Sequence, residues 1–417
     1  GCHMFVLFDE STPQRSMNRL THRLYFDDAY LTAFDATVLD VQQRADGPWL
    51  RLDRSAFYPT SGGQPHAIGT LTGPTGTAQV LDVLADDAGM VWHRVDVPLP
   101  VGKAVHGQID WARRHDHMQQ HGGEHILAGC VWALHQGYTH GLHIGADNST
   151  IDVTMPDGRT RLTEQEMAEL EDLANRRVQQ DAVIRAWFPD EQEMATLPLR
   201  KDPAVEGHVR VIAVGDFEYC ACGGTHPRRS GEIGLVKVLS TAPARGKMRI
   251  TFLCGMRALR HYRQVLHSAG QAGALLSAPP EGLAQAVERL KLDQSNLREQ
   301  VRALRLQSAE HTADALLQSA VPLPGGGRLC RAHLPLMDIE GLKAVATRLI
   351  EQLDVIALLS APVAEGQVLL FARGKGLPQD MSALLKQSGA RGGGKPDWAQ
   401  GSAQDEGALD RAQHALI

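Results

Sequence analysis

The chain has 417 residues, of which 43% are hydrophobic and 22% charged, and its formal net charge is −6 at pH 7. This length predicts about two to four folding units, and the composition excludes a disordered chain. No apolar run approaches the roughly 20 residues of a membrane span, and the basic start lacks the apolar core of a signal peptide, so we expect a cytoplasmic protein. The negative charge argues against a surface that binds nucleic acid everywhere, but it leaves room for local basic patches.

The first quarter of the chain predicts a small β-barrel. The segment Gly1–Met4 resembles a cloning remnant, and residues 1–23 as a whole show no clear pattern, so we place this extension outside the fold. From 24 to 109, short apolar stretches are separated by Gly, Pro and Asp turns, which is typical of strands. We therefore expect an N-terminal β-barrel domain over 24–109.

Residues 110–255 predict an α+β domain. After Asp110, apolar residues and histidines recur at three- and four-residue steps, which indicates a helix. A second helix should begin at Thr163, because Glu166 three places later completes a capping box. Strand-like segments return at 209–214 and 236–239, so helices and strands share this domain.

The last 162 residues predict a helical hairpin and a further α/β unit. A helical stretch over 256–320 is broken once at 277–280, which suggests two antiparallel helices. The second arm carries apolar residues at alternating four- and three-residue steps, the pattern of a narrow helix seam, at Leu283, Val287, Leu290, Leu297, Val301 and Leu304. A Pro/Gly linker then opens a C-terminal α/β domain over 321–417, with a glycine-rich segment at 389–394. The fold class is α+β.

Two short motifs contain the side chains best suited to bind a metal. His121 and His125 are four apart in a predicted helix, so both imidazoles leave the same face about one turn apart. Cys222 and His226 flank Gly-Gly-Thr, and the glycines let the chain turn tightly enough for both side chains to point inward. Three histidines and one cysteine suit Zn²⁺, which accepts both nitrogen and sulfur ligands.

Alternatives to this zinc site stay open. Cys220 is a rival ligand, although the three residues between Cys222 and His226 repeat the spacing of the histidine pair. A glycine turn with an incidental buried thiol is a second alternative. A zinc protease is disfavoured, because its glutamate would follow the first histidine directly, whereas Glu124 precedes His125 and should point away from the metal-facing side of the helix. Six cysteines without regular spacing do not suggest a disulfide framework.

The segments 54–65, 113–125 and 222–226, the last followed by Gly-Glu-Ile at 231–233, resemble the AlaX proteins, free-standing relatives of the alanyl-tRNA synthetase editing domain. The resemblance implies that His121, His125, Cys222 and His226 are the four zinc ligands of one site. It also implies hydrolysis of tRNA(Ala) mischarged with serine or glycine. Whether the zinc would activate the attacking water or only position the ester is not settled by the sequence.

The hairpin and the segment 392–400 resemble the C-terminal domain of alanyl-tRNA synthetases, which makes this chain similar to the long form of the family. That resemblance implies a tRNA-binding role, in which glycine amides and the nearby Lys386, Arg391 and Lys395 would contact phosphates. The seam of the hairpin would fit packing within one chain or between two, so a homodimer through the C-terminal region is one arrangement that it allows.

The amino-acid pocket departs from the family pattern at one position. Many members have threonine or serine after the first metal-binding histidine, where this chain has Gly122. Because that hydroxyl has been linked to serine recognition in the family, we expect weaker selectivity for serine over alanine here. His143, in a segment resembling the other side of the pocket, is a candidate for substrate contact, as are Thr60 and Gln64 of the glycine-containing motif.

Local clusters of basic residues are candidates for tRNA contact, and together they predict binding that weakens steeply with salt. They are Arg113, Arg114, Arg228, Arg229, Arg245, Lys247 and Arg249. The rival to an editing enzyme is a zinc-stabilised tRNA-binding protein without catalytic turnover, because the same four ligands could form a structural clip. A phosphoesterase is disfavoured, since no aspartate- and histidine-rich metal half is evident.

Overall fold

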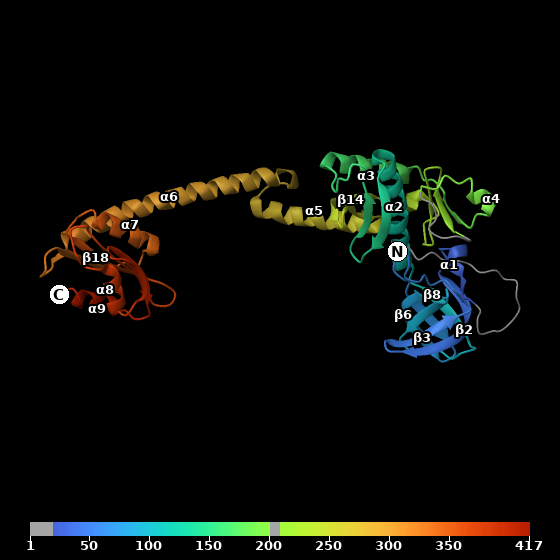
Figure 1. Cartoon of the computed structure of the whole chain (residues 1–417), viewed down its shortest axis with the longest axis horizontal. Coiled ribbons are helices and arrows are strands. Elements are labelled where there is room, and N and C mark those ends of the chain that lie inside the picture. Colours follow the sequence, from blue (N-terminus) through green and yellow to red (C-terminus); the bar gives the residue numbers. More distant parts are fainter. Residues whose placement is uncertain (1–19, 201–208) are drawn as a thin grey trace. The chain divides into compact units, whose positions relative to one another are not determined.

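A computed structural model describes residues 20–200 and 209–417 and divides the chain into two compact units, with the boundary between Ser268 and Ala269 (Figure 1). The expected cloning remnant and most of the N-terminal extension lie outside the described residues. None of the described helices combines the length and the apolar character that a membrane span requires.

The N-terminal part of the first unit is a closed six-stranded barrel, as predicted for residues 24–109. Its strands follow each other around the barrel in the order β2-β3-β7-β6-β5-β8. Buried and exposed residues alternate along them, so one face of each strand lines a core of aromatic and aliphatic side chains. The strands are β2 (Ala33–Arg44), β3 (Gly47–Leu52), β5 (Gly69–Gly73), β6 (Gly76–Ala85), β7 (Val91–Val95) and β8 (Ala104–Ile109).

Residues 21–23, which we placed in the extension, are attached to the barrel: the Thr21 hydroxyl donates to the Leu52 carbonyl oxygen, and a separate two-stranded sheet follows. The strand β1 (His22–Arg23) pairs in parallel with β4 (Arg54–Ser55), and the short helix α1 (Leu24–Asp27) follows it. Tyr25 of this helix is fully buried in the barrel core.

Residues 110–255 of the first unit form the predicted α+β domain, which the first part of α5 (Met256–Leu276) follows. A four-stranded antiparallel sheet, in the order β14-β15-β10-β9, packs on α2 and α3. The strands β11, β12 and β13 form a smaller, separate sheet, and along the chain they come between β10 and β14. The elements are α2 (Trp111–His135), β9 (Tyr138–Ile144), β10 (Ser149–Thr154), α3 (Glu164–Gln179), β11 (Ile184–Trp187), α4 (Glu191–Met194), β12 (Val211–Val214), β13 (Glu218–Ala221), the 3₁₀ turn η1 (Ser230–Ile233), β14 (Val236–Ala244) and β15 (Lys247–Cys254).

Both long helices of this domain begin at residues that can cap them. The Asp110 side chain accepts a hydrogen bond of 3.0 Å from the backbone N–H of Arg113 and so starts α2. The predicted capping box at the start of α3 is confirmed, since the Thr163 hydroxyl accepts from Glu166 N and the Glu166 carboxylate accepts from Thr163 N.

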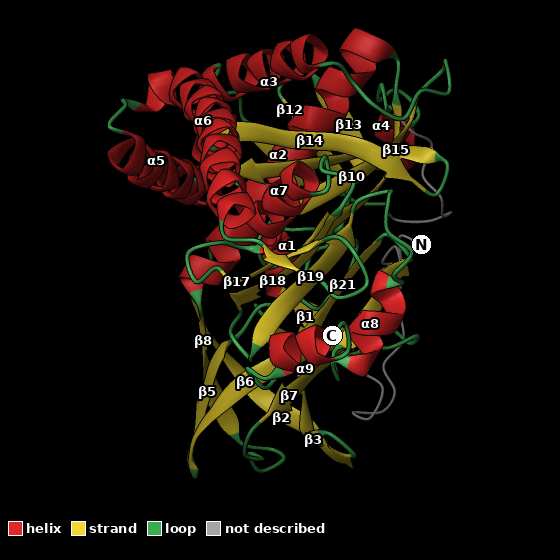
Figure 2. Ribbon diagram, turned by 90° about the vertical axis from the view of Figure 1, so that its left-hand side faces the viewer, coloured by secondary structure: helices red, strands yellow, loops and turns green. Residues whose placement is uncertain are grey.

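The second unit is built around a six-stranded sheet in the order β16-β17-β18-β19-β21-β20 (Figure 2). Side chains alternate between the two faces along β18: Ile356 and Leu358 join a core with α8 and α9, whereas Ala357 and Leu359 join a core with α6 and α7. The elements are α6 (Leu283–Gln318), β16 (Val321–Pro322), β17 (Arg328–His333), α7 (Ile339–Leu349), β18 (Val355–Pro362), β19 (Gln367–Arg373), α8 (Met381–Gln387), β20 (Arg391–Lys395), β21 (Trp398–Ala403) and α9 (Ala408–His414).

The structure changes three details of the sequence prediction. The break at 277–280 separates α5 (Met256–Leu276) from α6 through the 3₁₀ turn η2 (Pro280–Gly282), but the apolar stripe of α6 is exposed instead of forming a packed seam. Part of the expected linker is the short strand β16, because Val321 and Pro322 pair with β17. Much of the glycine-rich segment is β20, an edge strand and not a loop.

Candidate metal centre

The helix α2 presents two histidines to the same place. His121 and His125 are both buried, and their rings stack with centroids 5.3 Å apart and planes 3° from parallel. This is what a spacing of one helical turn produces. The pair therefore arises from local geometry that the sequence alone specifies.

The loop after β13 brings the other two side chains. The Cys222 sulfur lies 3.3 Å from His121 Nε2 and 3.6 Å from His226 Nε2, and His226 Nε2 lies 3.1 Å from His125 Nε2. The four ligand atoms all lie within 4.8 Å of one another. Zinc bonds of ordinary length would separate tetrahedral ligand atoms by roughly 3.3–3.8 Å, so these four residues, the quartet, have a spacing that fits one ion.

A glycine inside this loop makes room for a histidine of the quartet. A Cβ on Gly224 would lie only 2.1 Å from His121 Cε1 and 2.4 Å from its Nδ1. The sequence suggested that the glycines allow a tight turn, but Gly224 is required chiefly because an imidazole occupies the space of its side chain. Gly123 on α2 is required for a similar reason, since its Cβ would lie 2.1 Å from the Cys254 sulfur.

The barrel contributes a side chain to the quartet. Gln64 is buried, and its Oε1 lies 2.8 Å from His121 Nδ1 while its Nε2 donates to the Thr225 hydroxyl at 2.7 Å. An acceptor at Nδ1 fixes the proton there and leaves Nε2 free to bind a metal. Gln64 was predicted as a pocket residue, and the structure places it directly behind His121.

The turn that carries Gln64 depends on its two glycines. Ser61 and Gln64 exchange backbone hydrogen bonds of 3.1 and 2.9 Å, and Gly62 and Gly63 between them both have positive φ, at +58° and +82°. Two left-handed residues form the tightest hairpin turn, which favours glycine at both positions. A Cβ on Gly63 would also lie 1.8 Å from the Leu142 carbonyl oxygen, so this turn lies against β9.

Arg210 supports the Cys222 loop from behind. Its Nη1 donates to the carbonyl oxygens of Cys222 and Gly224 at 3.2 and 2.8 Å, and the residue is buried. We did not identify Arg210 from the sequence, because nothing in its local pattern distinguishes it from a surface arginine.

Burial keeps the histidines of the quartet neutral. Desolvation lowers the pKa of His121 to about 3, and it lowers the pKa of His125 and of His226 well below the usual value; Arg210 adds to all three effects. Neutral imidazole is the form that binds a metal. The quartet therefore needs no proton loss from its histidines at neutral pH.

Cys220 lies outside the quartet. It forms a second group with His125 and Glu218, whose ligand atoms are also within 4.8 Å of one another. Burial raises the pKa of the Cys220 thiol, and Arg200 donates to Glu218 at 2.8 Å, so this group offers a protonated thiol and a carboxylate that already has a cation. The geometry favours Cys222 over Cys220.

The remaining pocket candidates lie around this centre in different settings. Gly122 is buried on α2, and a Cβ there would meet Ile233 and Pro227 at 3.1 Å, so the missing side chain would enter a packed region. His143 is exposed on β9. Thr60 is also exposed, and its hydroxyl lies 3.2 Å from His66 Nδ1 without a contact to the quartet.

One of the predicted tRNA contacts is corrected by the structure. Arg114 is 1% exposed and donates to the carbonyl oxygens of Ala29 and Ala56, so it links α2 to the barrel and has no face for RNA. Arg113 is half-buried, with Nε donating to His66 O at 3.1 Å.

The other basic candidates of the first unit lie at the surface. Arg228 and Arg229 are exposed and form ion pairs with Asp28 and Asp181. The β14–β15 turn region carries three more cations, of which Arg249 pairs with Asp152 on β10; these are Arg245, Lys247 and Arg249.

The basic candidates of the second unit cluster near its edge strand. Arg391 and Lys395 are exposed at the two ends of β20, and Lys386 is exposed on α8, which packs on β20. Because β20 is an edge strand, backbone groups of its glycines face away from β21.

Sequence reasoning missed a buried charged cluster behind His125. Glu124, Glu218 and the side chain of Arg200, which is only 7% exposed, lie there, and Arg200 also donates to the Thr139 hydroxyl at 2.7 Å. Desolvation raises the pKa of Glu124 to about 7, against the opposing charge of Arg200. The contributing residues come from three separate segments, so no local spacing pointed to them.

Comparison with known sequence families finds two matches. Residues 209–251 match the threonyl and alanyl tRNA synthetase second additional domain, and residues 19–113 match the class II (A) tRNA synthetases. The first match contains Cys222 and His226, and the second contains the barrel with Gln64.

Curated relatives align with nearly the whole chain. The alanyl-tRNA editing protein AlaX-L of Pyrococcus horikoshii is 30% identical over 394 residues, which cover 92% of this chain and 94% of that protein. Alanine–tRNA ligases of Halorubrum lacusprofundi and Archaeoglobus fulgidus are 32% and 33% identical over 95% and 94% of this chain, but the match spans only 43% of each ligase. Among solved structures, the C-Ala domain of Aquifex aeolicus alanyl-tRNA synthetase aligns with 23% of this chain and 93% of that domain, at 15% identity and a TM-score of 0.22.

Proposed function

Because the chain belongs to the AlaX family of alanyl-tRNA editing proteins, we propose that it hydrolyses the ester between a wrongly attached amino acid and the terminal ribose of tRNA(Ala). The proposed amino acids are serine and glycine. The observation that carries this proposal is the quartet of three buried histidines and the half-buried Cys222, which is supported by Gln64 from the barrel.

The quartet fits a zinc ion by its chemistry as well as its spacing. Three neutral imidazoles and one sulfur are donors that zinc accepts, and His121 already has an acceptor at the nitrogen that would not face the ion. When bound, zinc would supply Lewis-acid polarisation of the ester or a lowered pKa for the attacking water. Four protein ligands would close a tetrahedral site, which favours a positioning role over direct activation of water.

The residues of this chain have separate roles in the proposal. Gln64 holds the tautomer of His121, and Arg210 holds the Cys222 loop through two carbonyl oxygens. The burial of all three histidines keeps bulk water away from the centre. The exposed His143 on β9 remains a candidate for contact with the amino acid or the terminal nucleotide.

The amino-acid preference should be weaker than in a threonine-bearing relative. Gly122 supplies no hydroxyl for serine, and discrimination by a hydroxyl depends on a polar partner in the pocket. Parallel deacylation of Ser-tRNA(Ala) and Ala-tRNA(Ala) by this protein and such a relative measures the ratio; equal ratios would contradict this part of the proposal.

We propose that tRNA binds through the surface cations of both units. The candidates that remain exposed or half-buried are Arg113, Arg228, Arg229, Arg245, Lys247, Arg249, Lys386, Arg391 and Lys395. Since each phosphate contact releases counterions, binding should weaken steeply between low and physiological salt. A filter-binding titration at several salt concentrations measures that slope.

The central test is hydrolysis of Ser-, Gly- and Ala-tRNA(Ala) by the wild type and by His125→Ala. The expected result is release of serine and glycine by the wild type and none by the variant. A matched control is His106→Ala, because His106 is exposed in the barrel, where its Nδ1 lies 2.8 Å from Asp35 Oδ1. Hydrolysis that survives in folded, metal-free protein would defeat the mechanism, and hydrolysis of no substrate would favour a zinc-stabilised tRNA-binding protein without turnover.

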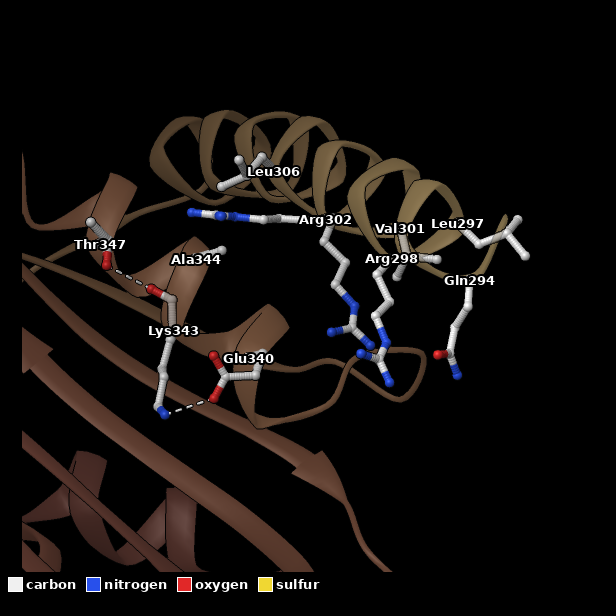
Figure 3. A pocket seen from close by; sticks show the side chains of 11 residues that line it. Gln294, Leu297, Arg298, Val301, Arg302, Leu306, Glu340, Lys343, Ala344 and Thr347 are labelled. Atoms are coloured by element: carbon white, nitrogen blue, oxygen red, sulfur yellow. Dashed lines mark hydrogen bonds and ion pairs between the residues drawn. The ribbon is translucent and has the colours of Figure 1, made fainter. Parts of the chain in front are cut away.

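We further propose that two copies associate through α6. Val287, Leu290, Leu297, Val301 and Leu304 of its apolar stripe are 44–64% exposed. Next to the stripe, a hollow of about 710 Å³ lies between α6 and α7, with Arg298 and Arg302 extending from α6 on the side of the Lys343–Glu340 ion pair (Figure 3). Apolar residues at this spacing are buried when a second helix lies along them.

Light scattering tests the association. The wild type should have the mass of a dimer, and a double substitution, Leu297→Glu with Val301→Glu, should give a monomer. Leu336→Glu is the matched control, because Leu336 is 99% exposed and lies outside the stripe. A monomeric wild type would contradict the proposal.

A further inference from the structure

The two histidines of α2 differ in what lies behind them. His121 Nδ1 has an acceptor at 2.8 Å, the Gln64 side chain. His125 Nδ1 is buried and has no hydrogen-bond partner among the described residues. The Nε2 atom of His125 faces the other quartet residues, at 3.1 Å from His226 Nε2. A neutral His125 that binds a metal through Nε2 must therefore carry its proton on Nδ1. A buried N–H without an acceptor destabilises the structure, because it has lost its hydrogen bond to water.

Glu124 is the group placed to accept that proton. Its Oε2 lies 3.9 Å from His125 Nδ1, and its side chain is only 11% exposed. The sequence suggested that Glu124 points away from the metal-facing side of α2. It is indeed absent from the quartet, but its carboxylate turns to the rear edge of the neighbouring imidazole.

The other polar groups near His125 are less suited to this role. Glu218 already accepts a hydrogen bond of 2.8 Å from Arg200. Cys220 donates its S–H to the Ala221 carbonyl oxygen, and a thiol is a weak acceptor. Arg200 can only donate, but its positive charge makes a second buried carboxylate less costly at this place.

We propose that Glu124 is a positioning residue for the metal site: its carboxylate accepts the Nδ1 proton of His125 and so holds the imidazole with Nε2 directed at the ion. A movement of about 1 Å closes the distance to that of a hydrogen bond. Carboxylate partners of this kind orient metal-binding histidines and raise their affinity for the metal. This inference rests on the proposed zinc site, and it gives the two α2 histidines different partners, an amide from the barrel and a carboxylate from the helix itself.

The test measures zinc affinity by competition with a chromophoric chelator in the wild type, Glu124→Leu and Glu124→Gln. Loss of the acceptor in Glu124→Leu should weaken zinc binding about 10- to 100-fold, and Glu124→Gln, which keeps an acceptor oxygen, should lie between that variant and the wild type. Glu171→Gln is the matched control: Glu171 accepts from Val238 N at 2.8 Å and contacts no member of the quartet, so its substitution should leave the affinity unchanged.

A second measurement does not depend on whether the variants fold. In ¹⁵N-histidine NMR spectra of the zinc-loaded wild type, the His125 Nδ1 proton should be protected from exchange with water. Rapid exchange of that proton, or zinc affinities of both Glu124 variants within twofold of the wild type, would overturn the inference and leave the proposed function standing. A wild type that binds no zinc would overturn both.

Discussion

The two units of the chain differ in how much their most distinctive side chains are exposed to solvent. In the first unit, three segments enclose the histidines of the quartet and leave Cys222 half-buried: the helix α2, the Cys222 loop and the barrel turn that carries Gln64. In the second unit, the apolar stripe of α6 and the arginines beside it are open to solvent. Around an enclosed site, few other side chains fit at each neighbouring position. On an exposed face, most side chains fit until a partner covers that face.

This difference determines where a small change should matter. Gly123 and Gly224 have no room for a methyl group, whereas the residues of the α6 stripe are 44–64% exposed. If this contrast holds, substitutions around the quartet should reduce activity or stability far more than substitutions on the α6 stripe.

The largest effect is expected for Gly224→Ala. The added methyl group would lie 2.1 Å from His121 Cε1, so either the imidazole or the loop must move by about an ångström, and a displacement of that size can reduce catalysis on the order of 100-fold. Deacylation kcat/KM and zinc affinity measure the effect. Gly270→Ala is the control, because nothing lies within 4 Å of the added atom there; equal behaviour of the two variants would remove the steric explanation.

Gln64→Leu should have the next largest effect. The substitution removes the acceptor for His121 Nδ1 and the donor to Thr225, and loss of such a partner weakens metal binding or activity about 10- to 100-fold. Zinc competition and deacylation rates report it. The exposed side chain of Gln79, also in the barrel, offers a matched Gln→Leu control; a Gln64→Leu protein with wild-type affinity would show that the barrel does not support the metal site.

A buried histidine should make the barrel sensitive to acid. His93 is fully buried with its Nε2 2.7 Å from the Ser55 hydroxyl, and burial lowers its pKa to about 4. The unfolded chain, with a histidine pKa of about 6.5, takes up the proton first as the pH falls. The stability present above pH 6.5 is therefore lost toward pH 4, by about 2 kcal/mol at pH 5.

Urea unfolding at pH 7 and pH 5 checks this expectation in the wild type and in His93→Gln. The variant should lose about 2 kcal/mol less than the wild type over this pH interval. If both proteins lose the same amount, other groups account for the acid sensitivity.

The smallest effect is expected on the open face of the second unit. Leu304→Ala should change the free energy of unfolding of dilute, unassociated protein by at most about 0.5 kcal/mol, because Leu304 is 64% exposed. Leu359→Ala, at a fully buried position of β18, should cost about 2–5 kcal/mol. Comparable losses measured by urea unfolding would mean that the stripe is already covered within one chain.

Much of the architecture could be predicted from the sequence, because it depends on local periodicity and capping. The barrel, the capping box at Thr163 and the histidine pair of α2 all follow from patterns within a few residues. The joining of that pair with Cys222 and His226, about 100 residues away, depended on the family resemblance, and the structure brings the four together.

What could not be predicted depends on contacts between distant segments. The local pattern around Arg114 is that of a surface cation on a helix, and only the folded barrel supplies the carbonyl oxygens that bury it. Gln64 contacts His121 across 57 residues of the chain, and Arg210 contacts Cys222 across 12. The imidazole of His121, on another element, occupies the space beside Gly224. The spacing of residues in the sequence does not reveal this contact.

The hydrogen bond from Gln64 has a consequence for where this protein can be divided. By composition, residue 110 separates a barrel from an editing domain, and a protein engineer would choose it as a place to cut. A fragment that begins there would retain all four residues of the quartet but would expose His121 Nδ1 and Thr225 to solvent where the amide of Gln64 now meets them. A fragment with a complete site must therefore include the barrel. The domain boundary predicted at residue 110 separates the quartet from Gln64, which supports it.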